Sequence, residues 1–115
     1  MKQTLNEVIQ WAEEVGIIEH STEFRQTLKV SEEWGEFCRC LFDNRREDAK
    51  IELGDVTIVC AIIAKLMGTD LEECMRRALE KNKSRKGKIS KHGNYIKEED
   101  IKIGKCSEDV KWLIH

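Results

Sequence analysis

The hydrophobic residues of the chain recur at intervals of three and four positions, which is the spacing of one face of an α-helix. The pattern predicts a first helix from Leu5 to about Val15. Thr4 and Glu7 have the spacing of a capping box at its start, and Gly16 is typical of a helix end. The chain therefore begins with an amphipathic helix.

Three further helices follow from the same periodicity. Ser21 or Thr22 is expected to cap the second helix. The third starts near Glu47 and stops at Gly68, and Asp70 with Glu73 caps the fourth. The third helix is apolar on nearly every side from residue 56 to residue 64, which predicts the most buried element. The apolar positions of the second and fourth helices are Phe24, Leu28, Trp34, Phe37 and Leu41, and Leu71, Cys74, Met75, Ala78 and Leu79.

The pattern changes after Arg85. Residues 89–96 predict a short β-hairpin that turns at 92–94, and Ser107 is expected to cap a short helix in the tail, with residues 112–114 as an apolar anchor. We therefore predict an all-α fold with a four-helix bundle core and a short hairpin-like extension. It is one domain over 1–115, with a helical core at about 4–86 and the hairpin and tail at 87–115.

Composition narrows the functional classes. The net charge of −2 gives no reason to expect nucleic acid or an acidic membrane as a partner. The apolar run at 56–64 is too short to span a bilayer. Five cysteines without a CxxC pattern or a signal peptide indicate a reduced, cytoplasmic setting, and Cys38 and Cys40 are interpreted as ordinary thiols.

Acidic residues form two short clusters with a mirrored spacing. If residue 44 is the midpoint of a turn between the second and third helices, positions 36 and 52 are equally far from it, and so are 33 and 55. An antiparallel helical hairpin would then place these side chains opposite one another in two layers. The clusters are Glu32, Glu33 and Glu36, followed by Glu52 and Asp55.

Converging carboxylates repel one another unless cations lie among them, and an all-oxygen ligand set suits Mg²⁺ or Mn²⁺. The alternative is a solvated helix face, because 37% of the residues are charged. Two features favour the metal site. Glu52 and Asp55 open the apolar run, and Trp34 and Phe37 interleave the first cluster, so the carboxylates lie at the edge of a core.

The end of the fourth helix is basic. Cations at a helix C-terminus are common for electrostatic reasons alone. Beside an acidic metal site they also suit a metal-bound polyphosphate, in which the cations take the remaining phosphate charge. No Walker loop is present. The basic residues are Lys81, Lys83, Arg85, Lys86 and Lys88.

The Glu-Glu-x-x-Glu segment at 32–36, fifteen intervening residues and Glu-x-x-Asp at 52–55 resemble the signature of the MazG-like all-α nucleoside triphosphate pyrophosphohydrolases. The likeness covers roughly residues 20 to 100 and is closest to the short, single-domain bacterial and phage members. It implies Mg²⁺-dependent cleavage of an NTP or dNTP to the monophosphate and pyrophosphate. The implied roles are metal binding by Glu33, Glu36, Glu52 and Asp55, and positioning or deprotonation of water by Glu32.

In this mechanism Lys81, Lys83 and Arg85 neutralise the phosphates. Lys29 is expected to form an i,i+4 salt bridge with Glu33. The apolar surface predicts a homodimer or homotetramer.

Three alternatives remain. A di-iron carboxylate bundle needs Glu-x-x-His pairs, and none of the three histidines follows a core glutamate at that spacing. A helical interaction module would dimerise without turnover. A hydrolase of this fold could also act on an alarmone or a damaged nucleotide, because the sequence has no readable code for the base.

Overall fold

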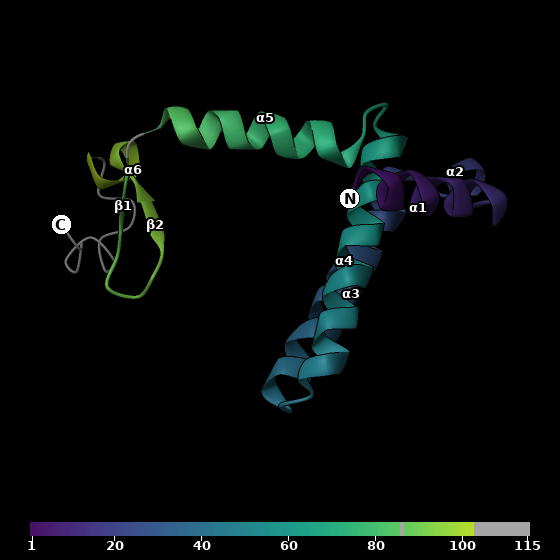
Figure 1. The fold of residues 1–115 in the computed structure, drawn as a ribbon, viewed down its shortest axis with the longest axis horizontal. Helices are drawn as coiled ribbons and strands as arrows, with labels where there is room; N and C mark the ends of the chain where they lie inside the picture. The colour runs from purple at the N-terminus through teal and green to yellow at the C-terminus, as the bar shows by residue number, and fades with distance from the viewer. Residues whose placement is uncertain (86, 103–115) are drawn as a thin grey trace. The chain divides into compact units, whose positions relative to one another are not determined.

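The computed structural model describes residues 1–85 and 87–102 of the chain. This part is all-α apart from one two-stranded sheet, which confirms the predicted fold class. The chain divides into two compact units, residues 1–75 and the part from residue 76 onward. Figure 1 labels the elements α1 (Lys2–Glu14), α2 (Ile17–His20), α3 (Glu23–Phe42), α4 (Arg46–Leu66), α5 (Leu71–Ser84), β1 (Gly87–Ile89), β2 (Tyr95–Lys97) and α6 (Glu98–Lys102).

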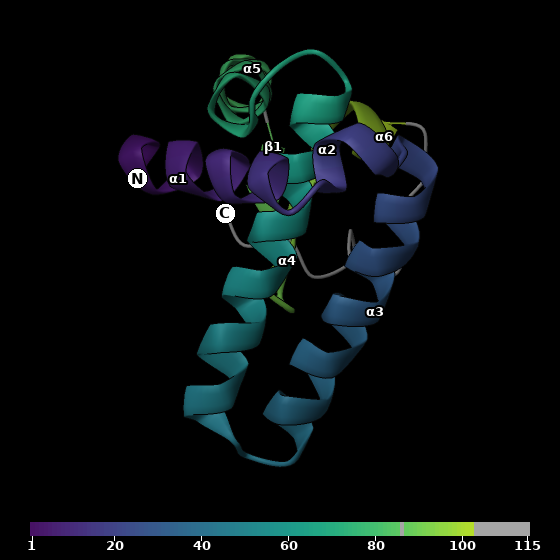
Figure 2. The ribbon, with the colours of Figure 1, turned by 90° about the vertical axis from the view of Figure 1, so that its right-hand side faces the viewer.

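The two long helices α3 and α4 form an antiparallel hairpin, as Figure 2 shows. A tight turn joins them. Asn44 has a φ of 58°, the left-handed conformation that asparagine adopts more readily than most residues. The backbone N–H of Arg45 donates to the carbonyl of Cys40 at 2.8 Å, and that of Asn44 donates to Leu41 at 3.1 Å. These two bonds satisfy two of the last four carbonyls of α3 at the point where the chain turns toward α4.

Side-chain caps start α3 and α5 at the predicted residues. Thr22 Oγ1 accepts a hydrogen bond from the backbone N–H of Arg25 at 3.1 Å. Asp70 Oδ1 accepts from the backbone N–H of Glu73 at 2.8 Å. Each cap satisfies one of the backbone donors that a helix leaves unpaired at its N-terminus.

The start of α1 differs from the prediction. Met1 is the N-cap residue and has no side-chain cap, and its carbonyl accepts from the N–H of Leu5 at 3.0 Å. The capping box of Thr4 and Glu7 was therefore wrong, because the helix extends to the start of the chain and Thr4 lies within it. Gly16 follows the end of α1, as predicted, and has a φ of 91°. A one-turn helix, α2, begins directly after it.

Helix α4 supplies most of the buried residues of the first unit, as predicted. Helix α1 crosses the C-terminal part of α4 (Figures 1 and 2), where Glu13 and Lys65 lie 4.0 Å apart. Most of the core side chains are small, so the helix backbones can approach one another closely. The buried apolar residues of this unit are Ala12, Cys40, Ala49, Val59, Ala61, Ile62 and Ala64.

The second unit contains the predicted hairpin. Strands β1 and β2 are antiparallel, with Gly87 opposite Lys97 and Ile89 opposite Tyr95. Gly93 has a φ of 84° in the turn. The predicted cap at Ser107 and the apolar anchor at 112–114 lie outside the described residues. No helix in the described ranges is long and apolar enough to cross a membrane.

Candidate metal centre

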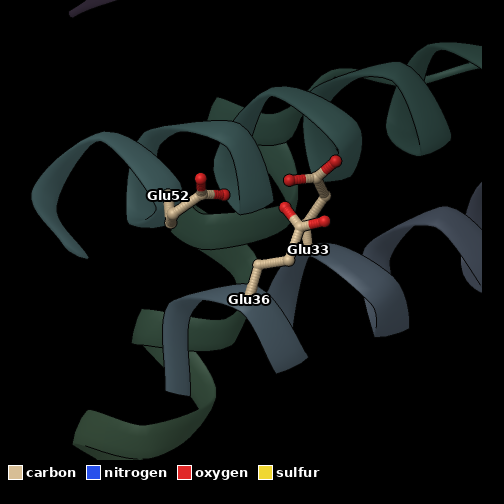
Figure 3. A group of neighbouring side chains, drawn as sticks. All are labelled: Glu33, Glu36 and Glu52. Carbon is tan, nitrogen blue, oxygen red and sulfur yellow. The ribbon is translucent and has the colours of Figure 1, made fainter. Parts of the chain in front are cut away.

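Three carboxylates meet across the α3–α4 hairpin. Glu33 and Glu36 lie one turn apart on α3, and Glu52 comes from α4 (Figure 3). One oxygen atom of each lies within 4.8 Å of an oxygen of the other two. The mirrored spacing in the sequence therefore brings three of the four predicted ligands together.

Asp55 lies one turn after Glu52 on α4 and is half-buried. It is outside the three-residue group, but its charge is close enough to raise the pKa of Glu52. Asp55 also lines a cavity together with Glu33. Glu32, the predicted water-activating residue, is next to the group, and 62% of its side chain is exposed.

Glu52 lies in a setting that disfavours its ionised form. Its Oε2 atom is buried and has no hydrogen-bond partner among the described residues. Burial, the negative charge of Glu36 and a carboxyl–carboxyl hydrogen bond with Glu36 raise the pKa of Glu52, with smaller contributions from the charges of Asp55 and Glu33. A buried carboxylate oxygen of this kind needs a positive partner when ionised.

One cation already contacts the group from within the chain. Lys29 Nζ lies 3.1 Å from Glu33 Oε1 and 3.8 Å from Glu32 Oε2. The hydrogen bond to Glu33 and the charges of both carboxylates raise the pKa of Lys29. The i,i+4 pair predicted for Lys29 and Glu33 is confirmed. It neutralises one side of Glu33, while Glu52 on the other helix has no such partner within residues 1–85 and 87–102.

The donor set fits a hard divalent cation. Carboxylate oxygens on two rigid helices are ligands that Mg²⁺ and Mn²⁺ accept, and the unpartnered Oε2 of Glu52 would gain a partner. Cys38 and Cys40 are free thiols outside this group.

A cavity of about 510 Å³ opens beside the carboxylates, between α3, α4 and the N-terminal helices. Glu33 and Asp55 line it, and so do Arg25 and Lys29. Sequence reasoning did not find this cavity. The sequence pattern that points to a polar surface here is the spacing of residues 26, 29, 33 and 36, which puts all four on one face of α3.

Residues 21–90, more than half of the chain, match the MazG nucleotide pyrophosphohydrolase domain. The chain belongs to this family. The matched segment contains the whole α3–α4 hairpin, so the carboxylate group lies in the part of the molecule that defines the MazG domain.

The MazG-family chain is also similar to an uncharacterised 18.2 kDa protein in the rep–hol intergenic region of Haemophilus phage HP1, strain HP1c1. The two are 35% identical over 65 residues, which cover 56% of this chain and 40% of the phage protein. No solved structure gives a significant match.

The predicted phosphate-binding cations belong to the second unit of this MazG-family chain. Lys81 and Lys83 are exposed in the last turn of α5. Arg85 Nε lies 3.8 Å from Glu99 Oε1, and its backbone carbonyl accepts a hydrogen bond from the Tyr95 hydroxyl at 3.3 Å. Arg85 therefore has a structural role in this unit besides any contact with a ligand.

Proposed function

We propose that the protein is a Mg²⁺-dependent nucleoside triphosphate pyrophosphohydrolase that converts an NTP or dNTP to the monophosphate and pyrophosphate. The proposal rests on the convergence of Glu33, Glu36 and Glu52, with a buried and unpartnered oxygen on Glu52, in a chain of the MazG family. Mn²⁺ would serve in place of Mg²⁺, because both take carboxylate oxygens.

The proposed metal ligands are Glu33, Glu36, Glu52 and Asp55. A divalent cation bound there would withdraw charge from the phosphate and lower the pKa of a nearby water. The two helices fix the backbone positions from which the carboxylates extend, so the ligands are held close together before a cation binds.

Glu32 is the proposed general base. Its exposed carboxylate accepts a proton as the water oxygen bonds to the α-phosphorus. The bond from that phosphorus to the bridging oxygen breaks, and pyrophosphate leaves with the bonding electrons. Lys29, 3.8 Å from Glu32, holds the base beside the metal ligands.

Lys81, Lys83 and Arg85 are the proposed contacts of the β- and γ-phosphates. Arg85 is paired with Glu99, so this ion pair would have to break before Arg85 could contact a phosphate of the substrate. Arg85→Ala should therefore raise KM much more than it lowers kcat.

A panel of NTPs and dNTPs with Mg²⁺, assayed separately for pyrophosphate and orthophosphate, tests the proposal. Pyrophosphate should be the product. In ¹⁸O-labelled water the label should enter the nucleoside monophosphate. Label in the pyrophosphate would mean attack at the β-phosphorus and would reject this mechanism. Absence of turnover with every nucleotide would reject the enzyme function.

A further inference from the structure

The cavity beside the carboxylates has the size and lining of a ligand site. Its volume of about 510 Å³ falls within the usual range for pockets that enclose small molecules. One end is acidic, at Glu33 and Asp55. The other is formed by Trp11, Ser21 and Gln26, so a ligand in the cavity would meet the metal ligands at one end and an aromatic and amide lining at the other.

The distance between the two ends suits a nucleotide. Gln26 precedes Glu33 by two helical turns on the same face of α3, which is roughly 10 Å along the helix axis. This is about the span from the base of a nucleoside monophosphate to its phosphorus. Lys29 lines the cavity between these levels, and its ammonium, 3.1 Å from Glu33, adds positive charge near the phosphate end. Arg25 lines the cavity at the level of Gln26.

The polar group at the far end has a fixed orientation. Gln26 Nε2 donates a hydrogen bond to Ser21 Oγ at 2.9 Å, and the pair is partly buried. That bond leaves Gln26 one amide N–H and its carbonyl oxygen. An adjacent donor and acceptor can form two hydrogen bonds with the edge of a nucleobase.

Trp11 provides an apolar surface close to this amide. Its side chain lines the cavity, and 48% of the residue's surface is exposed. A planar base that stacked on the indole would cover apolar surface whatever its identity. Stacking alone would therefore give affinity without selectivity, and selectivity would come from the amide.

We infer that this cavity binds the nucleobase of the substrate, and that Gln26, oriented by Ser21, determines which base is preferred. The inference rests on the proposed nucleotide function and adds the residues that select among nucleotides. Trp11 has a separate role, because it stabilises every base by a similar amount.

Calorimetric binding of AMP, CMP, GMP, UMP and dTMP to the full chain in Mg²⁺ tests the inference without turnover. Wild type should prefer one base by at least about tenfold. Gln26→Ala should reduce the ratio between the weakest and the tightest Kd among the five monophosphates, the spread, to about threefold. Ser21→Ala should also reduce this spread, but by less. Gln26→Glu keeps the size of the side chain and replaces the amide donor, so it should change the order of preference.

Two controls separate base recognition from general damage. Tripolyphosphate has the phosphate charge without a base, so its affinity should be the same in wild type, Gln26→Ala and Trp11→Leu. Gln3, which donates to Glu7 at 3.4 Å and lies outside the cavity, is the matched glutamine, and Gln3→Ala should keep the wild-type preference. Trp11→Leu should weaken all five monophosphates by roughly tenfold.

The inference is overturned if Gln26→Ala keeps the wild-type spread, or if it weakens tripolyphosphate as much as the monophosphates. If the protein releases pyrophosphate from nucleotides but substitution of Gln26 does not change the base preference, this inference is rejected and the proposed function stands. Base-selective binding that depends on Gln26, in a protein that hydrolyses no nucleotide, would reject the proposed function and leave the base site supported.

Discussion

The ammonium of Lys29 lies 3.1 Å from a carboxylate oxygen of Glu33, one helical turn before the acidic group. Lys29 therefore supplies part of the positive charge that stabilises the ionised carboxylates. It cannot supply all of it, because the buried Oε2 of Glu52, on the opposite helix, has no partner among the described residues. The difference between Glu33, which pairs with a cation, and Glu52, which does not, predicts how the carboxylate group responds to metal, pH and substitution.

Metal should stabilise the protein. Mg²⁺ or Mn²⁺ bound by the proposed site would bind the folded state only and relieve the repulsion among the carboxylates, so saturating metal should raise the Tm by several degrees. Glu52→Gln should abolish this rise in a thermal melt. Glu47→Gln is the matched control, because Glu47 is exposed on the same helix and pairs with Lys50. An unchanged wild-type melt after chelation and metal addition would mean that the metal site is wrong.

Removal of the Lys29 ammonium should tighten metal binding. The ammonium occupies one oxygen of Glu33 and repels an incoming cation, so Lys29→Met should lower the Mg²⁺ Kd by about fivefold, roughly 1 kcal/mol. Calorimetric titration measures this change. Lys50→Met removes a similar ammonium that pairs with Glu47, and it should leave the Kd unchanged. Equal or weaker binding by Lys29→Met would contradict the expectation.

The stability of the metal-free protein should depend on the titration of Glu52. Because the pKa of Glu52 is raised in the folded state, that state binds more protons than the unfolded state between the ordinary and the raised pKa. The free energy of unfolding therefore falls as pH rises through this interval. Glu52→Gln removes the effect, so it should be more stable than wild type above the raised pKa.

Below the ordinary carboxyl range this difference should disappear, since Glu52 is then protonated in both states. Urea denaturation in EDTA at several values between about pH 3 and pH 8 measures it. A difference between wild type and Glu52→Gln that stayed constant with pH would show that Glu52 titrates normally.

Loss of the proposed base should slow the reaction without removing the metal. Glu32→Gln should lower kcat on the order of 10²-fold and leave the Mg²⁺ Kd nearly unchanged, because Glu32 is outside the three-carboxylate group. Glu23→Gln, an exposed glutamate in the first turn of the same helix, is the control. A Glu32→Gln rate within about threefold of wild type would exclude Glu32 as the base.

The exposed apolar residues predict self-association. Phe24, Leu28 and Phe42 on α3 are 82%, 74% and 90% exposed, and burying such side chains releases apolar surface from water. We expect a homodimer or homotetramer by light scattering at micromolar concentration, shifted toward monomer by Phe24→Ser with Leu28→Ser. A wild-type particle of 13.4 kDa would contradict the oligomer.

Local signals predicted much of the fold. The caps at Thr22 and Asp70 form within a few residues of the chain, so their side-chain chemistry is visible in the sequence. The meeting of Glu36 with Glu52 was predictable because a tight turn and the helical period together fix the register of two antiparallel helices. The start of α1 was not, since Thr4 and Glu7 match a cap equally well inside a helix that begins earlier.

The cavity could not be predicted in this way. It depends on how α1 and α2 pack against the hairpin. The glycine at 16 indicated a helix end, but not the one-turn helix α2 that follows it or the direction in which α1 crosses α4. Trp11 and Gln26 are far apart in the chain, and neither belongs to a recognisable motif. Their common position is a product of tertiary packing, which local propensity does not encode.

If the carboxylate group binds a cation, the small buried side chains of α3 and α4 would make the hairpin selective for ionic radius. Cys40 lies one turn after Glu36, and Ala49 lies just under one turn before Glu52, so the thickness of these side chains limits how far apart the ligands on the two helices can be. Mg²⁺ binds oxygen at about 2.0–2.1 Å and Ca²⁺ at about 2.3–2.6 Å. A bulkier residue at either position would separate the helices and favour the larger ion, even though it touches no metal.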